Sequence, residues 1–191
     1  MTGTLSRGTN RQLWLVRHAP VLIEAGICYG RLNVPADARA TLACAIELAK
    51  VLPENVCISS SPLQRCEQLK LSLTALRPDL AHKTEPQLQE MNFGQWEGRA
   101  WAGIAKSELD SWTDDFASYP AGTTGETVSS FMARIASVFD EIKPASPTLW
   151  ITHAGVIRAA GLLAVGQRSV SQARDWPVHA PACGQWCKLE W

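Results

Sequence analysis

Short apolar runs alternate with longer segments of helical spacing, and this alternation constrains the fold more than any other feature of the sequence. Apolar runs of strand length lie at residues 12–16, 56–60 and 148–152. Segments with helical spacing or helix start signals lie at residues 38–52, 62–76, 126–142 and 156–166. A helix that connects two strands carries the chain back to the end of the sheet where the first strand began. The next strand then runs parallel to the first. We therefore expect an α/β fold, a three-layer sandwich with a mainly parallel sheet flanked by helices.

The remaining segments are less regular. Residues 85–124 combine Trp and Gly with weak periodicity, which predicts a small irregular cap subdomain with short helices. Residues 184–191 alternate and favour a final edge strand, whereas the polar residues 1–11 predict a flexible N-terminal segment. A chain of 191 residues is within the usual size of one domain, so we expect a single domain over residues 1–191.

The charge balance argues against some classes of partner. The sequence has eighteen basic and eighteen acidic residues, so no overall positive field would attract nucleic acid or a membrane surface. No apolar stretch has the roughly twenty residues that span a bilayer, and the polar start does not resemble a signal peptide. Six cysteines without a Cys-x-x-Cys pair fit free thiols in the cytoplasm and predict no metal site. We expect a cytoplasmic protein that acts on a small molecule, and its oligomeric state is not readable.

Two apolar runs end in histidine, with His18 after LWLVR and His153 after LWIT. The carboxyl ends of parallel strands meet at one edge of a sheet, where open α/β proteins bind ligands. Each histidine alone would more often be structural. Arg65 is expected one turn into the helix after the second strand, so Arg17 and Arg65 could both offer planar, bidentate donors to a phosphate. Gly155 would allow the N-terminus of the last helix to approach the same anion.

Four ordered motifs then identify a family. They are Leu-Val-Arg-His (residues 15–18), Ser-Ser-Pro-Leu-Gln-Arg (60–65), Glu-Met-Asn-Phe-Gly-Gln-Trp-Glu-Gly (90–98) and Thr-His-Ala-Gly-Val-Ile-Arg (152–158). The chain resembles the histidine phosphatase superfamily, which includes phosphoglycerate mutase-like proteins. Within it, residues 26–35 and 90–101 are most similar to the alpha-ribazole phosphatase branch.

The resemblance implies a role for each matching residue. His18 corresponds to the nucleophile, and Arg17, Arg65 and His153 correspond to the phosphate pocket. Glu90 corresponds to the acid that protonates the leaving group. The further substrate-binding positions implied are Tyr29, Gly30, Ala154 and Gly155. No cofactor and no metal are implied.

Some positions leave alternatives open. Glu97 competes with Glu90 for the acid, although its place in Trp-Glu-Gly favours a structural role. Ala19 stands where the family usually has Gly, and Glu24 stands where many members have Asn, so we expect Glu24 to point away from phosphate. The cap tryptophans Trp96, Trp101 and Trp112 are expected to pack, with ligand contact as the alternative.

Together these features predict a phosphomonoesterase that hydrolyses a small phosphate ester through a phosphohistidine. Alpha-ribazole 5'-phosphate, in cobalamin synthesis, is the candidate substrate. Phosphoglycerate mutase-type transfer is the alternative within enzymes, but such mutases tend to be longer. A non-catalytic phospho-ligand-binding protein is the alternative from another class, although both His18 and Glu90 are present.

Overall fold

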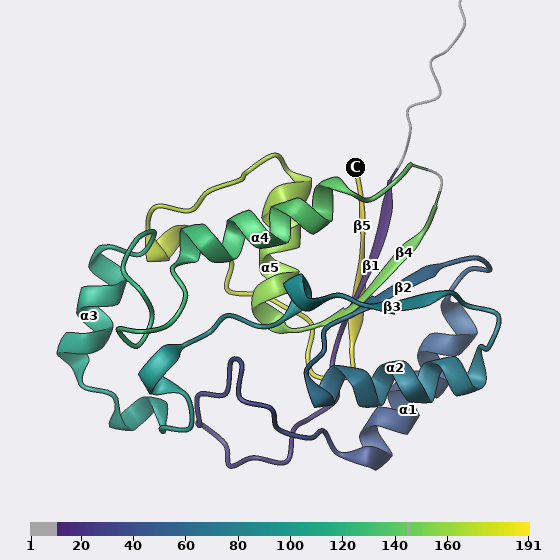
Figure 1. Cartoon of the computed structure of the whole chain (residues 1–191), viewed down its shortest axis with the longest axis horizontal. Helices are drawn as coiled ribbons and strands as arrows, with labels where there is room; N and C mark the ends of the chain where they lie inside the picture. The colour runs from purple at the N-terminus through teal and green to yellow at the C-terminus, as the bar shows by residue number, and fades with distance from the viewer. Residues whose placement is uncertain (1–10, 145) are drawn as a thin grey trace, which may run out of the picture.

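The computed structural model describes residues 11–144 and 146–191 (Figure 1). The segment expected to be flexible, residues 1–11, lies outside the described residues except for Arg11. The strands are β1 (Gln12–Arg17), β2 (Cys57–Ser60), β3 (His82–Thr84), β4 (Thr148–Thr152) and β5 (Trp186–Glu190). The helices are α1 (Ala38–Val51), α2 (Gln64–Leu76), α3 (Lys106–Asp114), α4 (Val128–Asp140) and α5 (Ala154–Ala164). No helix in these ranges is long and apolar enough to cross a membrane.

The strands form one sheet in the order β3-β2-β4-β1-β5. All neighbouring pairs are parallel except β1 with β5, which is antiparallel. The mainly parallel sheet and the final edge strand are therefore confirmed. The short strand β3 was not expected, because its three residues are polar and all exposed, so they carry no strand-like apolar pattern.

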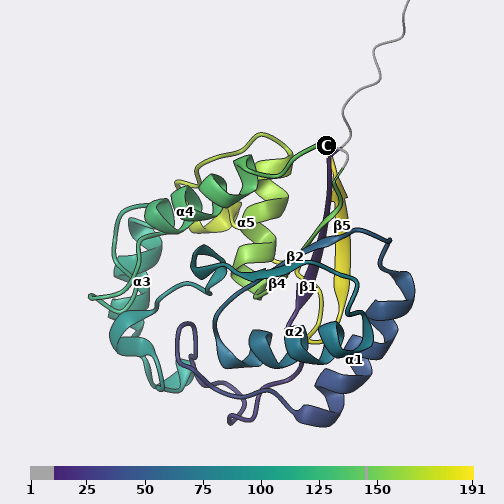
Figure 2. The same ribbon diagram turned by 45° about the vertical axis from the view of Figure 1, so that its right-hand side comes forward.

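Helices cover both faces of this sheet, which confirms the three layers. Successive residues of β1 point to opposite faces. Leu13 and Leu15 belong to the core under α4 and α5, whereas Val16 belongs to the core under α1 and α2. Figure 1 shows these two helix pairs on opposite sides of the strands, and the turned view in Figure 2 shows the same separation.

Two helix starts differ from the expected positions. The helix expected from Pro62 begins at Gln64. Residues 61–63 precede the helix, and there Ser61 Oγ accepts a hydrogen bond from Leu63 N–H. The helix expected from residue 126 begins at Val128, and its N-cap is Thr127, whose Oγ1 accepts from Ser130 N–H at 3.1 Å. The hydroxyl residues at 123 and 124 lie in the turn before this helix.

The segment over residues 85–124 is irregular, as expected. It contains α3 and short 3-10 turns at Pro86–Leu88, Gly94–Trp96 and Trp101–Gly103. An isolated bridge between Ile27 and Ala100 joins it to the loop that follows β1. This loop and the irregular segment therefore meet beside the carboxyl end of β1.

Candidate active site

The strand ends bring the two histidines together. In the sheet register Arg17 lies opposite Thr152, so β1 and β4 end at the same level. The ring centroids of His18 and His153, which follow these strands, are 5.2 Å apart. The expected convergence of the two imidazoles on one edge of the sheet is therefore present in the structure.

His18 is held in one tautomer. Its backbone N–H donates to Thr152 O at 3.0 Å, and its ring Nδ1 lies 2.8 Å from Ala19 O. A carbonyl oxygen only accepts, so Nδ1 carries the proton and Nε2 keeps its lone pair. Burial, together with the positive charges of Arg65 and Arg17, lowers the pKa of His18 to about 3. The ring is therefore a neutral base with a free nitrogen at physiological pH.

Arg65 and His153 form a buried layer next to His18. The fully buried guanidinium of Arg65 donates from Nε to His153 Nδ1 at 3.2 Å, and its terminal nitrogens donate to Leu32 O at 2.9 Å and Gly30 O at 2.7 Å. His153 Nδ1 is thus an acceptor, so Nε2 carries the proton and donates to Ser61 Oγ at 2.9 Å. Both ring nitrogens of His153 are engaged within the protein.

A cavity of about 240 Å³ opens in front of His18. Six of the predicted site residues line it: Arg17, His18, Tyr29, Gly30, Glu90 and Ala154. The other four lining residues were not among the predicted site residues, although ligand contact was the alternative for the tryptophan: Ile27, Phe93, Trp101 and Arg158. The predicted residues Arg65, His153 and Gly155 are not part of its wall, because Arg65 and His153 lie buried next to His18 and Gly155 lines a neighbouring cavity.

Arg17 and Arg158 are the guanidinium groups that face this cavity. One chain segment holds both of them, because Arg17 Nη1 donates to Pro181 O at 3.2 Å and Arg158 Nη2 donates to Val178 O at 2.9 Å. Neither Nε has a hydrogen-bond partner among the described residues. Arg158 is in the quoted Thr-His-Ala-Gly-Val-Ile-Arg motif, and it lies four residues after Ala154, on the same side of α5. That spacing was the signal that could have found it.

Glu90 is positioned by two helices. Its Oε2 accepts from Gly155 N–H at 3.0 Å, at the N-terminus of α5, where a negative charge is favoured. Its backbone oxygen accepts from Arg134 of α4 at 3.1 Å. A Cβ at Gly155 would lie 2.3 Å from Glu90 Oε1, so only glycine allows this approach. The expected use of the Gly155 N–H for phosphate is not what the structure shows, since the carboxylate of Glu90 occupies it.

The competing carboxylate, Glu97, has a different environment. Its Oε1 accepts from the backbone N–H groups of Arg31 at 2.8 Å and Phe93 at 3.0 Å, and it is not among the residues that line the cavity. It thereby connects the loop of Gly30 to the irregular segment. Glu24 is exposed and also absent from the cavity wall, consistent with the expectation that it points away.

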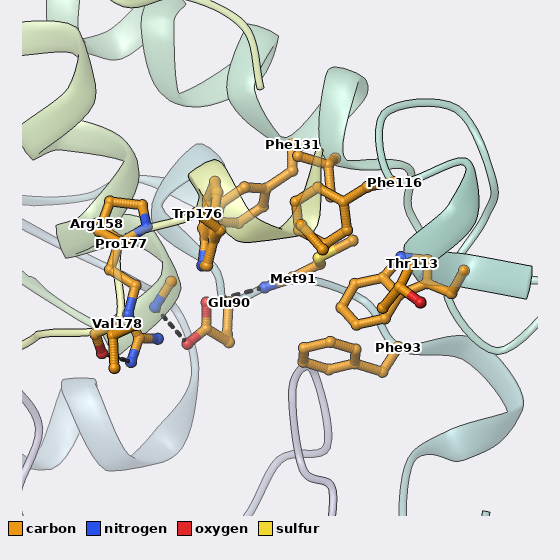
Figure 3. Close-up of a pocket in the computed structure, with 14 residues that line it drawn as sticks. Glu90, Met91, Phe93, Thr113, Phe116, Phe131, Arg158, Trp176, Pro177 and Val178 are labelled. Carbon is orange, nitrogen blue, oxygen red and sulfur yellow. Dashed lines mark hydrogen bonds between the residues drawn. The ribbon is translucent and has the colours of Figure 1, made fainter. Parts of the chain in front are cut away.

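A second cavity, of about 440 Å³, adjoins the first. The two cavities share Glu90, Phe93 and Arg158, and Figure 3 shows Glu90 and Arg158 together at one end. The three cap tryptophans have different surroundings. Trp96 is buried and donates to Glu108, Trp101 lines the first cavity, and Trp112 lines the second.

Other nucleophiles and metal ligands contribute little here. Cys66 Sγ lies 3.6 Å from His153 Nε2, but burial raises the pKa of this thiol to about 12, so it stays protonated. Within residues 11–144 and 146–191, no group of three or more His, Cys, Asp or Glu side chains could hold a metal ion.

The fold and the site define a three-layer α/β protein with a neutral histidine at the carboxyl edge of its sheet, faced by two arginines and one glutamate. A family model for the histidine phosphatase superfamily (branch 1) matches residues 13–191, and the chain belongs to this superfamily. The resemblance in the four motifs is therefore confirmed. Membership places the chain among phosphatases and phosphoryl-transfer enzymes.

Solved structures share the fold of this chain. A mycobacterial glucosyl-3-phosphoglycerate phosphatase is similar with a TM-score of 0.76 and 22% identity, over 95% of this chain and 90% of that one. A protein of Escherichia coli K-12 proposed as an alpha-ribazole-5'-P phosphatase has a TM-score of 0.75 and 20% identity, over 94% of this chain and 90% of that one. TTHB049 from Thermus thermophilus has a TM-score of 0.70 and 25% identity, over 93% of this chain and 92% of that one. Comparison with curated proteins gives no match.

Proposed function

We propose that the protein is a phosphomonoesterase that hydrolyses a small phosphate ester through a phosphohistidine at His18. The observation that carries this proposal is the tautomer of His18, because the hydrogen bond from Nδ1 to Ala19 O leaves Nε2 unprotonated at the cavity. A neutral imidazole nitrogen is a competent nucleophile for phosphorus.

In the first step, the Nε2 lone pair forms a bond to phosphorus while the bond from phosphorus to the ester oxygen breaks. The carboxylic acid form of Glu90 gives its proton to the departing oxygen. Arg17 and Arg158 face the cavity and offset the charge on the phosphoryl oxygens. Arg65 adds a positive charge beside His18, with two of its five N–H groups unused in the hydrogen bonds to His153, Leu32 and Gly30.

In the second step, the carboxylate of Glu90 takes a proton from a water molecule. The water oxygen then bonds to phosphorus, and the bond between phosphorus and Nε2 breaks, which releases inorganic phosphate. His18 is again neutral and Glu90 is again protonated, so the cycle closes without a metal or cofactor in any step. His153 acts as a positioning residue, since its Nδ1 accepts from Arg65 and fixes that guanidinium.

For the natural substrate we propose alpha-ribazole 5'-phosphate, on the strength of the sequence resemblance and of the similar Escherichia coli protein. Phosphoglycerate mutase-type transfer is the second candidate within the superfamily. The two reactions differ in the acceptor, since a phosphatase gives the phosphoryl group to water and a mutase returns it to an alcohol. The ratio of inorganic phosphate released to ester consumed distinguishes them, and we expect a ratio near one.

The first prediction tests the nucleophile. After brief exposure to a phosphate ester and a rapid quench, mass spectrometry should find an acid-labile phosphoryl group on His18. His18→Ala should abolish both the label and turnover, whereas the matched control His82→Ala, at an exposed position of β3, should retain both. A label on serine, aspartate or cysteine would contradict the proposed mechanism. Binding of phosphate esters without any label or turnover would instead favour a non-catalytic phospho-ligand-binding protein.

A further inference from the structure

The second cavity lies directly beyond the group that protonates the leaving oxygen. The first cavity, of about 240 Å³, is smaller than the roughly 300–1,000 Å³ of typical small-molecule sites. It can hold a phosphoryl group, but the rest of an ester needs more space. The second cavity offers about 440 Å³, and Glu90 is in the wall of both. An oxygen within reach of Glu90 is therefore at the boundary, with phosphorus on one side and the leaving group on the other.

We propose that this second cavity binds the leaving group and selects a flat, uncharged aromatic one. This inference rests on the phosphatase function proposed above and goes further, because it assigns the leaving group to a particular cavity and derives its chemical class from the residues of the wall. The occupant is thus part of the substrate itself.

The aromatic side chains in the wall of the cavity favour an aromatic leaving group. Trp176 is in ring contact with Phe116 and Phe131, each at a centroid distance of 6.2 Å, and Trp112 lies 5.1 Å from Phe116. All four rings line the cavity. In Figure 3, Phe93, Phe116 and Trp176 lie on different sides of it. Aromatic rings that can adopt offset or edge-to-face contacts favour another aromatic ring between them.

The distribution of charge points the same way. Glu90 and Arg158 are the charged residues in this wall, and both are at the junction with the first cavity. Away from this junction the wall offers polar groups such as the Thr113 hydroxyl and the Trp112 indole N–H, but no cation. A carboxylate placed deeper would therefore lose its hydration without gaining a positive partner, which is costly. A phosphoglycerate-like leaving group is therefore disfavoured, and a ring system that bears an alkyl alcohol is favoured.

The experiment compares two esters with leaving alkoxides of similar basicity, 2-(1-naphthyl)ethyl phosphate and ethyl phosphate. Both need the proton from Glu90, so the ratio of their kcat/KM values reports on the cavity and not on the chemistry. We expect the naphthyl ester to be favoured in the native protein. Trp176→Ala, which removes a wall, should reduce this ratio by about 10- to 100-fold, as for an aromatic contact at the centre of a binding site.

A second variant and a control distinguish a loss of the aromatic subsite from a general effect on folding. Ala173→Phe places a ring in the cavity without removing any wall, and it should also reduce the ratio. The control Trp191→Ala removes a tryptophan that stacks on Phe139 and is not in the cavity wall, so it should preserve the ratio. Calorimetry on His18→Ala measures binding of both esters in the absence of turnover, and there too the naphthyl ester should bind more tightly.

The outcomes separate this inference from the function on which it rests. An unchanged ratio in both cavity variants, with continued hydrolysis through His18, would overturn the aromatic subsite and leave the phosphatase standing. Selective binding of the naphthyl ester with no hydrolysis of either ester would overturn the assignment of the aromatic group as a leaving group. Failure to bind or hydrolyse either ester would overturn both proposals.

Discussion

At the scale of single residues, His18 and Glu90 must hold opposite protonation states on either side of one phosphoryl group. Burial, together with the positive charges of Arg65 and Arg17, lowers the pKa of His18, so its ring stays neutral. Glu90 is oriented by a different element, because its Oε2 accepts a hydrogen bond from the Gly155 N–H at the N-terminus of α5. The nucleophile is ready in the free protein, and the proton comes from a carboxyl group fixed to a different element.

The second prediction is that the loss of rate in Glu90→Gln depends on the leaving group of the ester. An alkyl phosphate releases a strongly basic alkoxide, so loss of the acid should reduce the rate by about 10²- to 10⁴-fold. p-Nitrophenyl phosphate releases a weak base, so phosphoenzyme formation should lose much less. Rapid-quench kinetics should then show phosphoenzyme accumulating, because water attack has lost its base.

The matched control is Glu97→Gln. Glu97 Oε1 accepts from two backbone N–H groups, and an amide oxygen can accept both. We therefore expect no dependence on the leaving group for this variant. Equal losses of phosphoenzyme formation for both esters in Glu90→Gln would mean that Glu90 positions the substrate and that Glu97 should be examined as the acid.

At the scale of elements, α5 tests how closely Glu90 must be placed. The third prediction is that Gly155→Ala reduces kcat for alkyl phosphates, since its Cβ would lie 2.3 Å from Glu90 Oε1 and must displace the carboxylate. Gly161→Ala is the control in the same helix, where a Cβ meets nothing within 4 Å. That variant should retain activity and stabilise the fold by about 0.5–1 kcal/mol, measured by urea unfolding. Equal activity of the two variants would contradict this role of Gly155.

Much of this architecture was predictable from local patterns. β1, β2 and β4 are apolar runs, and the helices between them carry apolar residues at regular spacing, so the layers and the parallel sheet follow from the sequence. β3 was not predicted, because its residues His82, Lys83 and Thr84 are polar and exposed. This strand depends on pairing with β2 instead of burial. Helix starts were less predictable, since several hydroxyl residues can cap and the turn geometry decides which one does.

The site was predictable where motifs follow strand ends, as at Arg17, His18 and Ala154. Side-chain partners were not. The burial of Arg65 depends on carbonyl groups of Gly30 and Leu32, which lie in a loop without periodic signals. The aromatic wall at Trp176 comes from a segment far along the chain whose place depends on tertiary packing. Such contacts leave no mark in local periodicity.

At the scale of the whole molecule, the formal net charge is zero, so recognition of an anion depends on where the cations are placed. Arg17 and Arg158 are concentrated at one cavity, and the carbonyl groups of residues 178 and 181 hold them there. Burial, and after it the positive charges of Arg65 and Arg17, lower the pKa of both His18 and His153, which links the chemistry of the site to the stability of the fold.

The last prediction concerns acid stability. Folding depresses the pKa of His18 from its usual 6.5 to about 3, and burial also holds the pKa of His153 well below its usual value. Between pH 6.5 and about 3 the unfolded chain therefore binds more protons than the folded one. The stabilising contribution is fully present above pH 6.5 and is lost as the pH falls. For His18 the loss between pH 7 and pH 5 should be about 2 kcal/mol.

Urea unfolding at pH 7 and pH 5 measures this loss. His18→Gln removes one titrating group, so the difference in unfolding free energy between the two pH values should shrink by about 2 kcal/mol, and His153→Gln should shift it in the same direction. The control His82→Gln, at an exposed position of β3, should show the same pH dependence as the native chain. An unchanged pH dependence in His18→Gln would mean that His18 binds a proton in the folded protein as readily as in the unfolded chain, which would contradict the effect of burial and leave the nucleophile without its lone pair at pH 5.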